Sequence, residues 1–132
     1  MFCIICGEDT AVSNSRPAKR TPAIWRRRQC RACRTIFSTR EKPDLSLSIK
    51  VKQKTNDLQP FSEEKLLLSV YECLSHRKDA LESSAELKAT IIVKLLPVRS
   101  GILNSLEISK TAYQVLRRFD KTSATIYKAH HN

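Results

Sequence analysis

Two stretches, Cys3-Ile4-Ile5-Cys6 and Cys30-Arg31-Ala32-Cys33, decide how the first third of this chain folds. Each is a pair of cysteines with two residues between them, and 23 residues separate the two pairs. Zinc binds thiolate strongly and takes four ligands tetrahedrally, and one tight turn presents both sulfurs of such a pair to the same ion. We therefore predict one structural zinc ion, bound by Cys3, Cys6, Cys30 and Cys33.

Three other uses of these cysteines are less consistent with the sequence. Disulfides belong to oxidising compartments, and we expect no signal peptide here and hence reduced thiols. A redox-active pair normally follows a strand and opens a helix, which neither pair does. A catalytic zinc keeps one ligand position open for water, whereas four cysteines leave none.

The positive charge of the chain is concentrated near these cysteines. The formal net charge is +11 and the calculated pI is about 9.8. Residues 1–43 contain ten Lys or Arg and three Asp or Glu, a net charge of +7, and residues 44–132 carry the remaining +4. Such a patch attracts a polyanion, and each neutralised phosphate releases counterions. We expect a nucleic-acid partner. The alternative is a solvated patch on a ribosomal or membrane-surface protein.

Arginines next to a zinc ligand are the best candidates for contacts with DNA. The backbone is held there by the metal, so the guanidinium groups are partly pre-positioned for phosphate or base edges. The predicted DNA-binding residues are Arg16, Arg26, Arg27, Arg28 and Arg31, and Lys19, Arg20 and Arg34 extend the patch.

We predict a boundary near Lys42-Pro43-Asp44 that separates two domains, residues 1–43 and residues 44–132. The first has too few apolar residues to build a core without the metal. Short strands around 11–13, 23–28 and 35–39, joined by turns, would form a three-stranded zinc ribbon.

The second domain is expected to begin with a strand hairpin. Leu45, Leu47, Ile49 and Val51 alternate with polar residues, and a period of two predicts a half-buried strand. Thr55-Asn56-Asp57 then predicts a turn, and residues 58–61 a short returning strand.

Helices follow the hairpin. Ser62 is placed to cap a first helix running to about Ser75. A second is expected to begin at Ser83-x-x-Glu86 and to stop near Pro97, and a third at Asn104-x-x-Glu107. A last short helix is expected over 122–130. The fold class predicted from these elements is α+β, a small sheet with a helical bundle behind a zinc ribbon.

In three segments the residues resemble those of known families. The string Arg26-Arg27-Arg28-Gln29 followed by Cys30-Arg31-Ala32-Cys33-Arg34-Thr35-Ile36-Phe37-Ser38-Thr39-Arg40-Glu41 resembles the NrdR family of bacterial transcriptional repressors. Asn14-Ser15-Arg16-Pro17 is similar to the Asp-Ser-Arg segment of that family. Pro60-Phe61-Ser62-Glu63-Glu64-Lys65-Leu66 resembles the opening of an ATP-cone from its hairpin into its first helix.

The resemblance implies a repressor of ribonucleotide reductase genes that joins a DNA-binding zinc ribbon to an ATP-cone. The cone would sense ATP and dATP and change the state of a homo-oligomer, so that the ribbons can or cannot reach double-stranded DNA. The positions that match the nucleotide site are Val51, Lys52, Lys54 and Lys65. The alternative for each lysine is an exposed, solubilising charge.

The chain also departs from that family. Gln53 stands where the most direct alignment expects a lysine, and the turn at 55–57 lacks the usual glycine. Trp25 replaces the first of four arginines, which exchanges a phosphate contact for stacking or for packing over the metal site. The competing hypothesis is therefore a general nucleic-acid-binding zinc-ribbon protein without nucleotide sensing.

An enzyme is not expected. The chain contains only Gly7 and Gly101 and no glycine-rich phosphate loop, and no Ser/His/Asp or paired-carboxylate arrangement stands out. No apolar run approaches the ~20 residues of a membrane span. We expect a cytoplasmic protein with no membrane partner.

Overall fold

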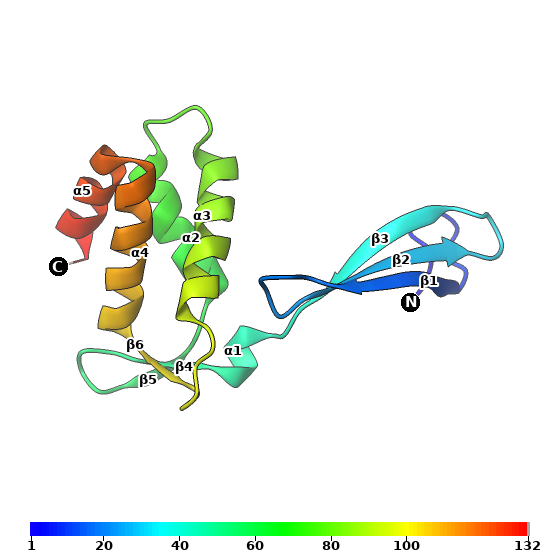
Figure 1. Cartoon of the computed structure of the whole chain (residues 1–132), viewed down its shortest axis with the longest axis horizontal. Helices are drawn as coiled ribbons and strands as arrows, with labels where there is room; N and C mark the ends of the chain where they lie inside the picture. The colour runs from blue at the N-terminus through cyan, green and yellow to red at the C-terminus, as the bar shows by residue number, and fades with distance from the viewer. Residues whose placement is uncertain (132) are drawn as a thin grey trace. The chain divides into compact units, whose positions relative to one another are not determined.

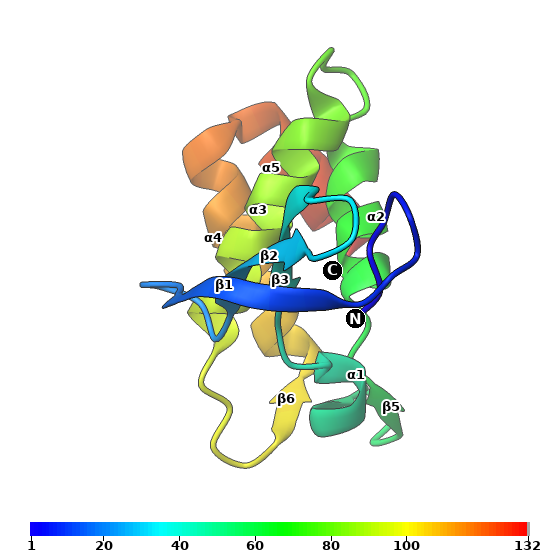
Figure 2. The ribbon, with the colours of Figure 1, turned by 90° about the vertical axis from the view of Figure 1, so that its right-hand side faces the viewer.

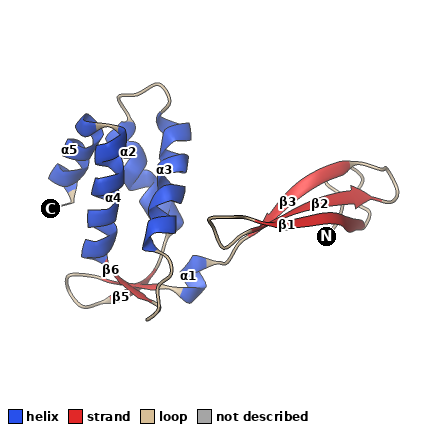
Figure 3. Ribbon diagram, in the orientation of Figure 1, coloured by secondary structure: helices blue, strands red, loops and turns tan. Residues whose placement is uncertain are grey.

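The computed structural model describes residues 1–131 and divides into two compact units, Met1–Pro43 and Asp44–Asn132. The first unit is built from strands and the second mainly from helices, which Figure 1 and Figure 3 show for each unit. Within residues 1–131, no helix has both the length and the apolar character needed to cross a bilayer.

The first unit is a three-stranded antiparallel sheet in the order β1-β2-β3. Its strands are β1 (Thr10–Pro17), β2 (Ile24–Cys30) and β3 (Ile36–Glu41), so the predicted ribbon is confirmed and its strands are longer than predicted. A register shift between Val12 and Asn14 makes a bulge in β1, and Ser13 Oγ at the bulge donates a hydrogen bond to the Arg27 carbonyl.

Almost no apolar side chain is buried in the first unit. Among its described residues, the buried hydrophobic side chains are those of Cys3 and Cys30, and Thr10 is the one buried polar residue. Phe2, Ile4 and Ile5 are 71%, 65% and 69% exposed. A sheet of this size needs a further stabilising element, and the cysteine cluster is the one that the fold provides.

The second unit begins with a helical turn where the alternating pattern predicted a strand. α1 spans Leu45–Ser48, and Asp44 caps it by accepting a hydrogen bond from the Ser46 amide. Leu45 and Ile49 are buried four residues apart, whereas Leu47 is 81% exposed. The strand prediction for 45–48 is therefore wrong, because the Asp44 cap and a helical spacing account for the same leucines.

A small three-stranded sheet follows α1. β4 (Lys50–Lys52) pairs antiparallel with β5 (Leu58–Pro60), which confirms the predicted hairpin, and parallel with β6 (Ile102–Asn104), which was not predicted. Asn56 adopts a left-handed φ of 68° in the connecting turn. Asparagine tolerates this region well, so the turn forms without a glycine.

Four helices complete the second unit and pack into one bundle, with the small sheet and α1 at one end (Figure 1, Figure 2). They are α2 (Glu63–Leu74), α3 (Ala80–Leu95), α4 (Ser105–Phe119) and α5 (Lys121–His130). The predicted caps of two helices are confirmed, since Ser62 Oγ accepts from the Lys65 amide and Asn104 forms a capping box with Glu107. α3 begins three residues before Ser83, with Asp79 at its cap position.

The bundle encloses a continuous apolar core. Leu74, Ile91, Leu116 and Val70 are its largest fully buried side chains, one or more from each of α2, α3 and α4, and Tyr127 joins them from α5. The α+β fold class, with a zinc ribbon followed by a small sheet and a helical bundle, is confirmed.

Candidate metal centre and ligand-binding surfaces

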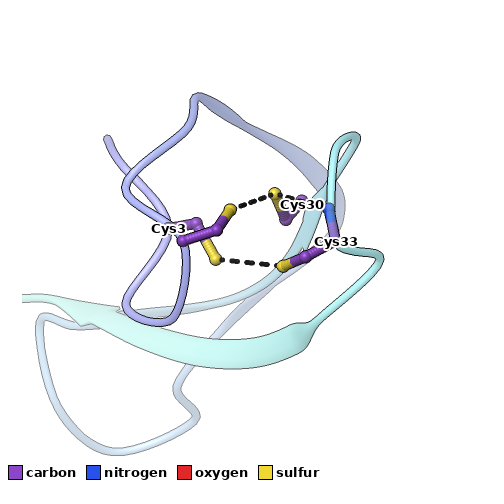
Figure 4. Close-up of side chains that lie close together, drawn as sticks. Cys3, Cys30 and Cys33 are labelled. Atoms are coloured by element: carbon purple, nitrogen blue, oxygen red, sulfur yellow. Dashed lines mark hydrogen bonds between the residues drawn. The ribbon is translucent and has the colours of Figure 1, made fainter.

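The four predicted zinc ligands come together at one end of the ribbon. Their sulfur atoms all lie within 4.8 Å of one another. Cys3 Sγ is 3.6 Å from Cys33 Sγ, and Cys6 Sγ is 3.5 Å from Cys30 Sγ. Figure 4 shows the side chains of Cys3, Cys30 and Cys33 turned toward a common centre. Tetrahedral zinc with bonds of about 2.3 Å places its sulfurs about 3.8 Å apart, so the cluster fits one zinc ion.

Each cysteine pair lies on a tight backbone turn. The Gly7 amide donates to the Cys3 carbonyl and the Arg34 amide to the Cys30 carbonyl, at 3.0 and 3.1 Å. Gly7 and Arg34 have φ values of 79° and 62°, a left-handed conformation that closes both turns. Backbone amides also point at two sulfurs, since Ile5 N lies 3.4 Å from Cys3 Sγ and Cys33 N lies 3.5 Å from Cys30 Sγ. Donors placed this way stabilise the thiolate form that binds metal.

The Thr35 hydroxyl favours the thiolate of Cys33. It lies 3.1 Å from Cys33 Sγ, and this contact, together with the Thr35 amide, lowers the pKa of Cys33 to about 6. All four ligands are cysteines, which is the donor set of a structural rather than a catalytic zinc. One structural zinc ion is therefore supported by geometry and chemistry together.

The ribbon sheet places neighbouring arginines of β2 on opposite faces. Side chains alternate along a strand, and residues directly opposite each other in paired strands share a face. Arg26 pairs with Ser15 and Thr39, whereas Arg27 pairs with Asn14 and Ser38. Three consecutive arginines that look equivalent in the sequence therefore divide into two sets.

Arg26 and Arg28 point to the face that also carries Cys30, and both are engaged within the ribbon. Arg26 donates to Glu41 Oε2 through Nε and Nη2, at 3.2 and 2.8 Å, and to Ser15 Oγ at 3.1 Å. Arg28 Nη1 donates to Thr10 Oγ1 at 3.3 Å. Its Nε is buried without a hydrogen-bond partner among residues 1–131.

The opposite face, which we term the open arginine face, is more exposed, and none of the β1, β2 and β3 residues on it is an Asp or Glu. Arg27 and Gln29 on β2 are exposed, and Trp25 two residues before Arg27 is half-buried. Trp25 pairs with Arg16 on β1 and with Arg40 on β3, so its two neighbours are both arginines. The open arginine face consists of Arg16, Trp25, Arg27, Gln29 and Arg40.

A hollow of about 440 Å³ lies where this face meets the metal centre. Arg31 and Arg34 line it together with Ser13, Gln29 and Cys30. Arg31 and Arg34 are both exposed, and each directly follows a metal ligand in the chain, Arg31 after Cys30 and Arg34 after Cys33. The hollow offers an anion two guanidinium groups on a metal-held turn.

The structure therefore brings Arg16, Arg27 and Arg31 of the predicted DNA contacts to one side of the sheet, and Arg26 and Arg28 to the other. Sequence reasoning missed Arg40 and Gln29. The period of two along the predicted strands would have found Gln29, but placing Arg40 beside Trp25 required the register of β3.

In the second unit, a pocket of about 250 Å³ opens between the β4–β5 hairpin and the starts of two helices. Ser62, the cap of α2, and Ser105, the first residue of α4, both line it. The amides at helix starts carry partial positive charge and bind anions. Two such starts facing one pocket suit an anionic ligand.

Val51 and Lys65 of the predicted nucleotide site line this pocket, and Lys52 and Lys54 do not. Val51 is buried on β4, while Lys52 next to it is exposed and Lys54 lies in the turn. Gln53 and Gln59 line the pocket, which gives it amide groups where the resemblance led us to look for further lysines.

Sequence reasoning also missed an aromatic wall of the pocket. Tyr127 and His131 both line it, and their rings stack with centroids 4.1 Å apart at 23°. Burial raises the pKa of Tyr127 and lowers the pKa of His131, so both rings are favoured in their neutral forms. Tyr127 is buried in the core, so the exposed ring of His131, stacked on it, is the one that offers a surface to a flat ligand group such as a nucleobase.

Comparisons of the ribbon and of nearly the whole chain with known proteins find the same family. Residues 1–41 match the family model of the N-terminal domain of NrdR-like transcriptional repressors, which is a zinc ribbon. Transcriptional repressor NrdR of Symbiobacterium thermophilum is 31% identical, and the alignment covers 97% of this chain and 87% of that protein. The repressors of the same name from Dechloromonas aromatica and Maricaulis maris are 31% and 30% identical over 97% and 99% of this chain, and 86% and 84% of those proteins.

Proposed function

Since the chain belongs to the NrdR family of transcriptional repressors, we propose that it represses ribonucleotide reductase genes by binding DNA upstream of them under the control of ATP and dATP. The observation that carries this proposal is the open arginine face. It is a set of uncompensated cations and one aromatic ring on a sheet whose shape depends on a metal centre.

The two faces of the ribbon would have different roles in DNA binding. Arg26 is already neutralised by Glu41, and Arg28 is half-buried against Thr10, so we assign both to holding the sheet in shape. Arg16, Arg27 and Arg40 have no such partners among residues 1–131 and are available for phosphate or base edges. Arg31 and Arg34 would hold a further phosphate at the hollow beside the metal centre.

We assign the nucleotide to the pocket of the second unit. Lys65 and the starts of α2 and α4 would hold phosphate groups, and Val51 would lie against the base or sugar. Lys52 and Lys54 would act on the phosphates at longer range from the hairpin. The stacked rings of Tyr127 and His131 suit an adenine base.

Nucleotide control would operate through a homo-oligomer. A ligand shifts an equilibrium only by binding one arrangement more tightly than another. A single small ribbon has few base contacts, so paired ribbons in one arrangement would supply selectivity for the operator. Leu68 and Tyr71, which lie one turn apart on α2 and are 58% and 39% exposed, are a candidate surface for contact between subunits.

One observation favours the competing function, a general nucleic-acid binder without nucleotide sensing. Lys65 is the single lysine or arginine among the residues lining the pocket, and a triphosphate carries several negative charges. A weak or lost nucleotide response would leave a ribbon that binds DNA without control.

Fluorescence anisotropy with the zinc-loaded protein separates the two functions. The probes are a duplex from upstream of the ribonucleotide reductase genes of the source organism and a scrambled duplex of equal length, each with no nucleotide, with ATP and with dATP. We expect selective binding that changes with nucleotide. Equal, strongly salt-dependent binding to both duplexes, indifferent to nucleotide, would favour the general binder.

Two lysine variants make the nucleotide result specific. Lys65→Ala should lose the nucleotide response and keep DNA binding in the absence of nucleotide. Lys110→Ala, an equal loss of charge on α4 outside the pocket, should keep both.

A further inference from the structure

We propose that Arg27 and Gln29 read two base pairs in the major groove, a guanine by Arg27 and an adenine by Gln29, within about two base steps of each other. This inference rests on the proposed DNA binding by the open arginine face. It assigns sequence selectivity to two side chains and leaves the other cations of that face to the phosphates.

The spacing of the two side chains matches the spacing of base pairs. Arg27 and Gln29 are successive residues on the same face of β2, about 7 Å apart along an extended strand. Base pairs rise about 3.4 Å per step, so that distance covers about two steps. β2 is the middle strand of the sheet, so these two side chains project from the centre of the face that would approach the groove.

The neighbours of these two side chains leave them free to project. Arg27 lies between Asn14 and Ser38, and Gln29 lies beside Ala11, all shorter side chains. Asn14 Oδ1 already accepts a hydrogen bond from the Ser15 amide at 2.8 Å, which occupies the acceptor that base recognition by this amide would need. Neither Arg27 nor Gln29 has a side-chain partner within the described part of the chain.

The chemistry of each side chain specifies a different base. An arginine donates two parallel hydrogen bonds to O6 and N7 of guanine, and a glutamine amide pairs with N6 and N7 of adenine. Ile36 lies opposite Gln29 on β3 and is 49% exposed. The methyl group of thymine faces the major groove in the same base pair as adenine, and an exposed isoleucine beside Gln29 is suited to contact it.

Binding-site selection from a library of duplexes with a randomised centre tests this assignment, using the full-length, zinc-loaded protein. The wild type should select a motif in which a guanine and an adenine lie within two steps. Arg27→Lys keeps the charge and loses the planar fork, so its motif should show a weaker preference for the guanine and keep the adenine. Gln29→Ala should lose the adenine alone. We expect each preference to fall by about 5- to 150-fold, and the salt dependence to stay unchanged.

Matched controls distinguish base reading from general binding. Arg28→Lys makes the same change on the other face of the ribbon, Arg117→Lys makes it at an exposed position of α4, and Gln114→Ala removes an exposed amide from α4. All three should select the wild-type motif. Motifs that stay unchanged in Arg27→Lys and Gln29→Ala would overturn the inference. A zinc-loaded wild type that enriches no motif would instead contradict sequence-specific DNA binding itself.

Discussion

Different interactions stabilise the fold of each of the two units. In the ribbon, the buried hydrophobic side chains are two cysteines of the metal centre, whereas the second unit buries leucine, isoleucine, valine and aromatic side chains from all four of its long helices. The metal closes a long loop of the ribbon at one point. The apolar core spreads the stability of the second unit over many contacts.

Each unit is therefore sensitive to a different kind of change, and each can carry a different kind of binding site. A ribbon stabilised by chelation does not need to bury its arginines, so it can present both faces of a sheet to solvent. The second unit has a true core and can hold a pocket between rigid helix starts. We expect the units to respond separately to metal removal, core substitution, acid and surface charge.

The largest effect should come from the metal centre. Cys30→Ser, or removal of zinc by a chelator, should unfold the ribbon, because metal binding in such modules is worth roughly 10–16 kcal/mol. The helical circular dichroism of the second unit should persist. Cys73→Ala is the matched control, since this thiol is buried on α2 of the second unit and is not one of the four zinc ligands, and it should keep zinc and DNA binding. If the ribbon kept dispersed amide resonances after a chelator had removed the zinc, the metal would not be what stabilises it.

A core substitution should act on the other unit alone. Leu116 on α4 is fully buried, and Leu116→Ala should cost about 2–5 kcal/mol of the free energy of unfolding of the second unit, through lost contacts and the cavity that remains. Denaturant unfolding followed by circular dichroism measures this change. Leu47→Ala, at a position 81% exposed, should change it by less than about 0.5 kcal/mol. Loss of zinc from Leu116→Ala would show that the units are not independent.

Acid should separate the units in a defined order. Hydrogen bonds from Arg77 and Ser83 lower the pKa of Asp79 to about 2, and bonds from Ser123 and Thr122 lower the pKa of Asp120. Because these folded-state pKa values are depressed, the stability they provide is complete above about pH 4 and is lost as the pH falls toward 2.

Zinc thiolates compete with protons at higher pH than these carboxylates do. The ribbon should therefore lose its metal first in an acid titration that follows zinc release and helical signal together. Simultaneous loss of both signals, or earlier loss of the helical signal, would contradict this order.

A smaller effect is expected at the helix junction near Asp120. Its carboxylate caps α5 by accepting from the Thr122 amide, and it lies 3.2 Å from His76 Nε2. Asp120→Asn keeps a capping side chain and removes the charge, whereas Asp120→Ala removes both. Thermal unfolding should show a loss of about 0.5–2 kcal/mol for Asp120→Ala and a smaller loss for Asp120→Asn. Equal losses would mean that the charge, rather than the cap, carries the effect.

The smallest effect should be at the Arg26–Glu41 ion pair, which lies on the face of the ribbon opposite the open arginine face. Glu41→Gln leaves Arg26 without its carboxylate, but exposed pairs contribute only about 0–1 kcal/mol, and Glu41 is 63% exposed. We expect zinc stoichiometry and the unfolding midpoint of the ribbon to change little. A large loss would show that the side chains of this face add substantially to what the metal provides.

The parts of the structure that were predictable from the sequence are those with local causes. The spacing within Cys3/Cys6 and Cys30/Cys33 reflects what one turn can offer to one ion, and the caps at Ser62 and Asn104 involve residues three positions apart or fewer. The turn at 55–57 formed as predicted because Asn56 takes the left-handed conformation that a glycine would otherwise supply.

The parts that were not predictable depend on distant residues. Leu45 and Ile49 satisfy both a strand period and a helical one, and the Asp44 cap decides between them. β6 is only three residues long and exists because it pairs with β4, some fifty residues earlier. The division of the arginines depends on register, since only the pairing of β2 with β3 sets Glu41 on the face of Arg26 and Arg40 beside Trp25.

The most direct test of this account compares Arg27→Ala with Arg26→Ala in the zinc-loaded protein, measuring affinity for duplex DNA by anisotropy over a series of salt concentrations. These neighbours carry the same charge on opposite faces of one strand. We expect Arg27→Ala to stay folded with full zinc and to bind DNA more weakly, and Arg26→Ala to bind nearly as well as the wild type and to keep its salt dependence. Equal losses in the two variants, or a larger loss for Arg26→Ala, would contradict the claim that the open arginine face binds DNA.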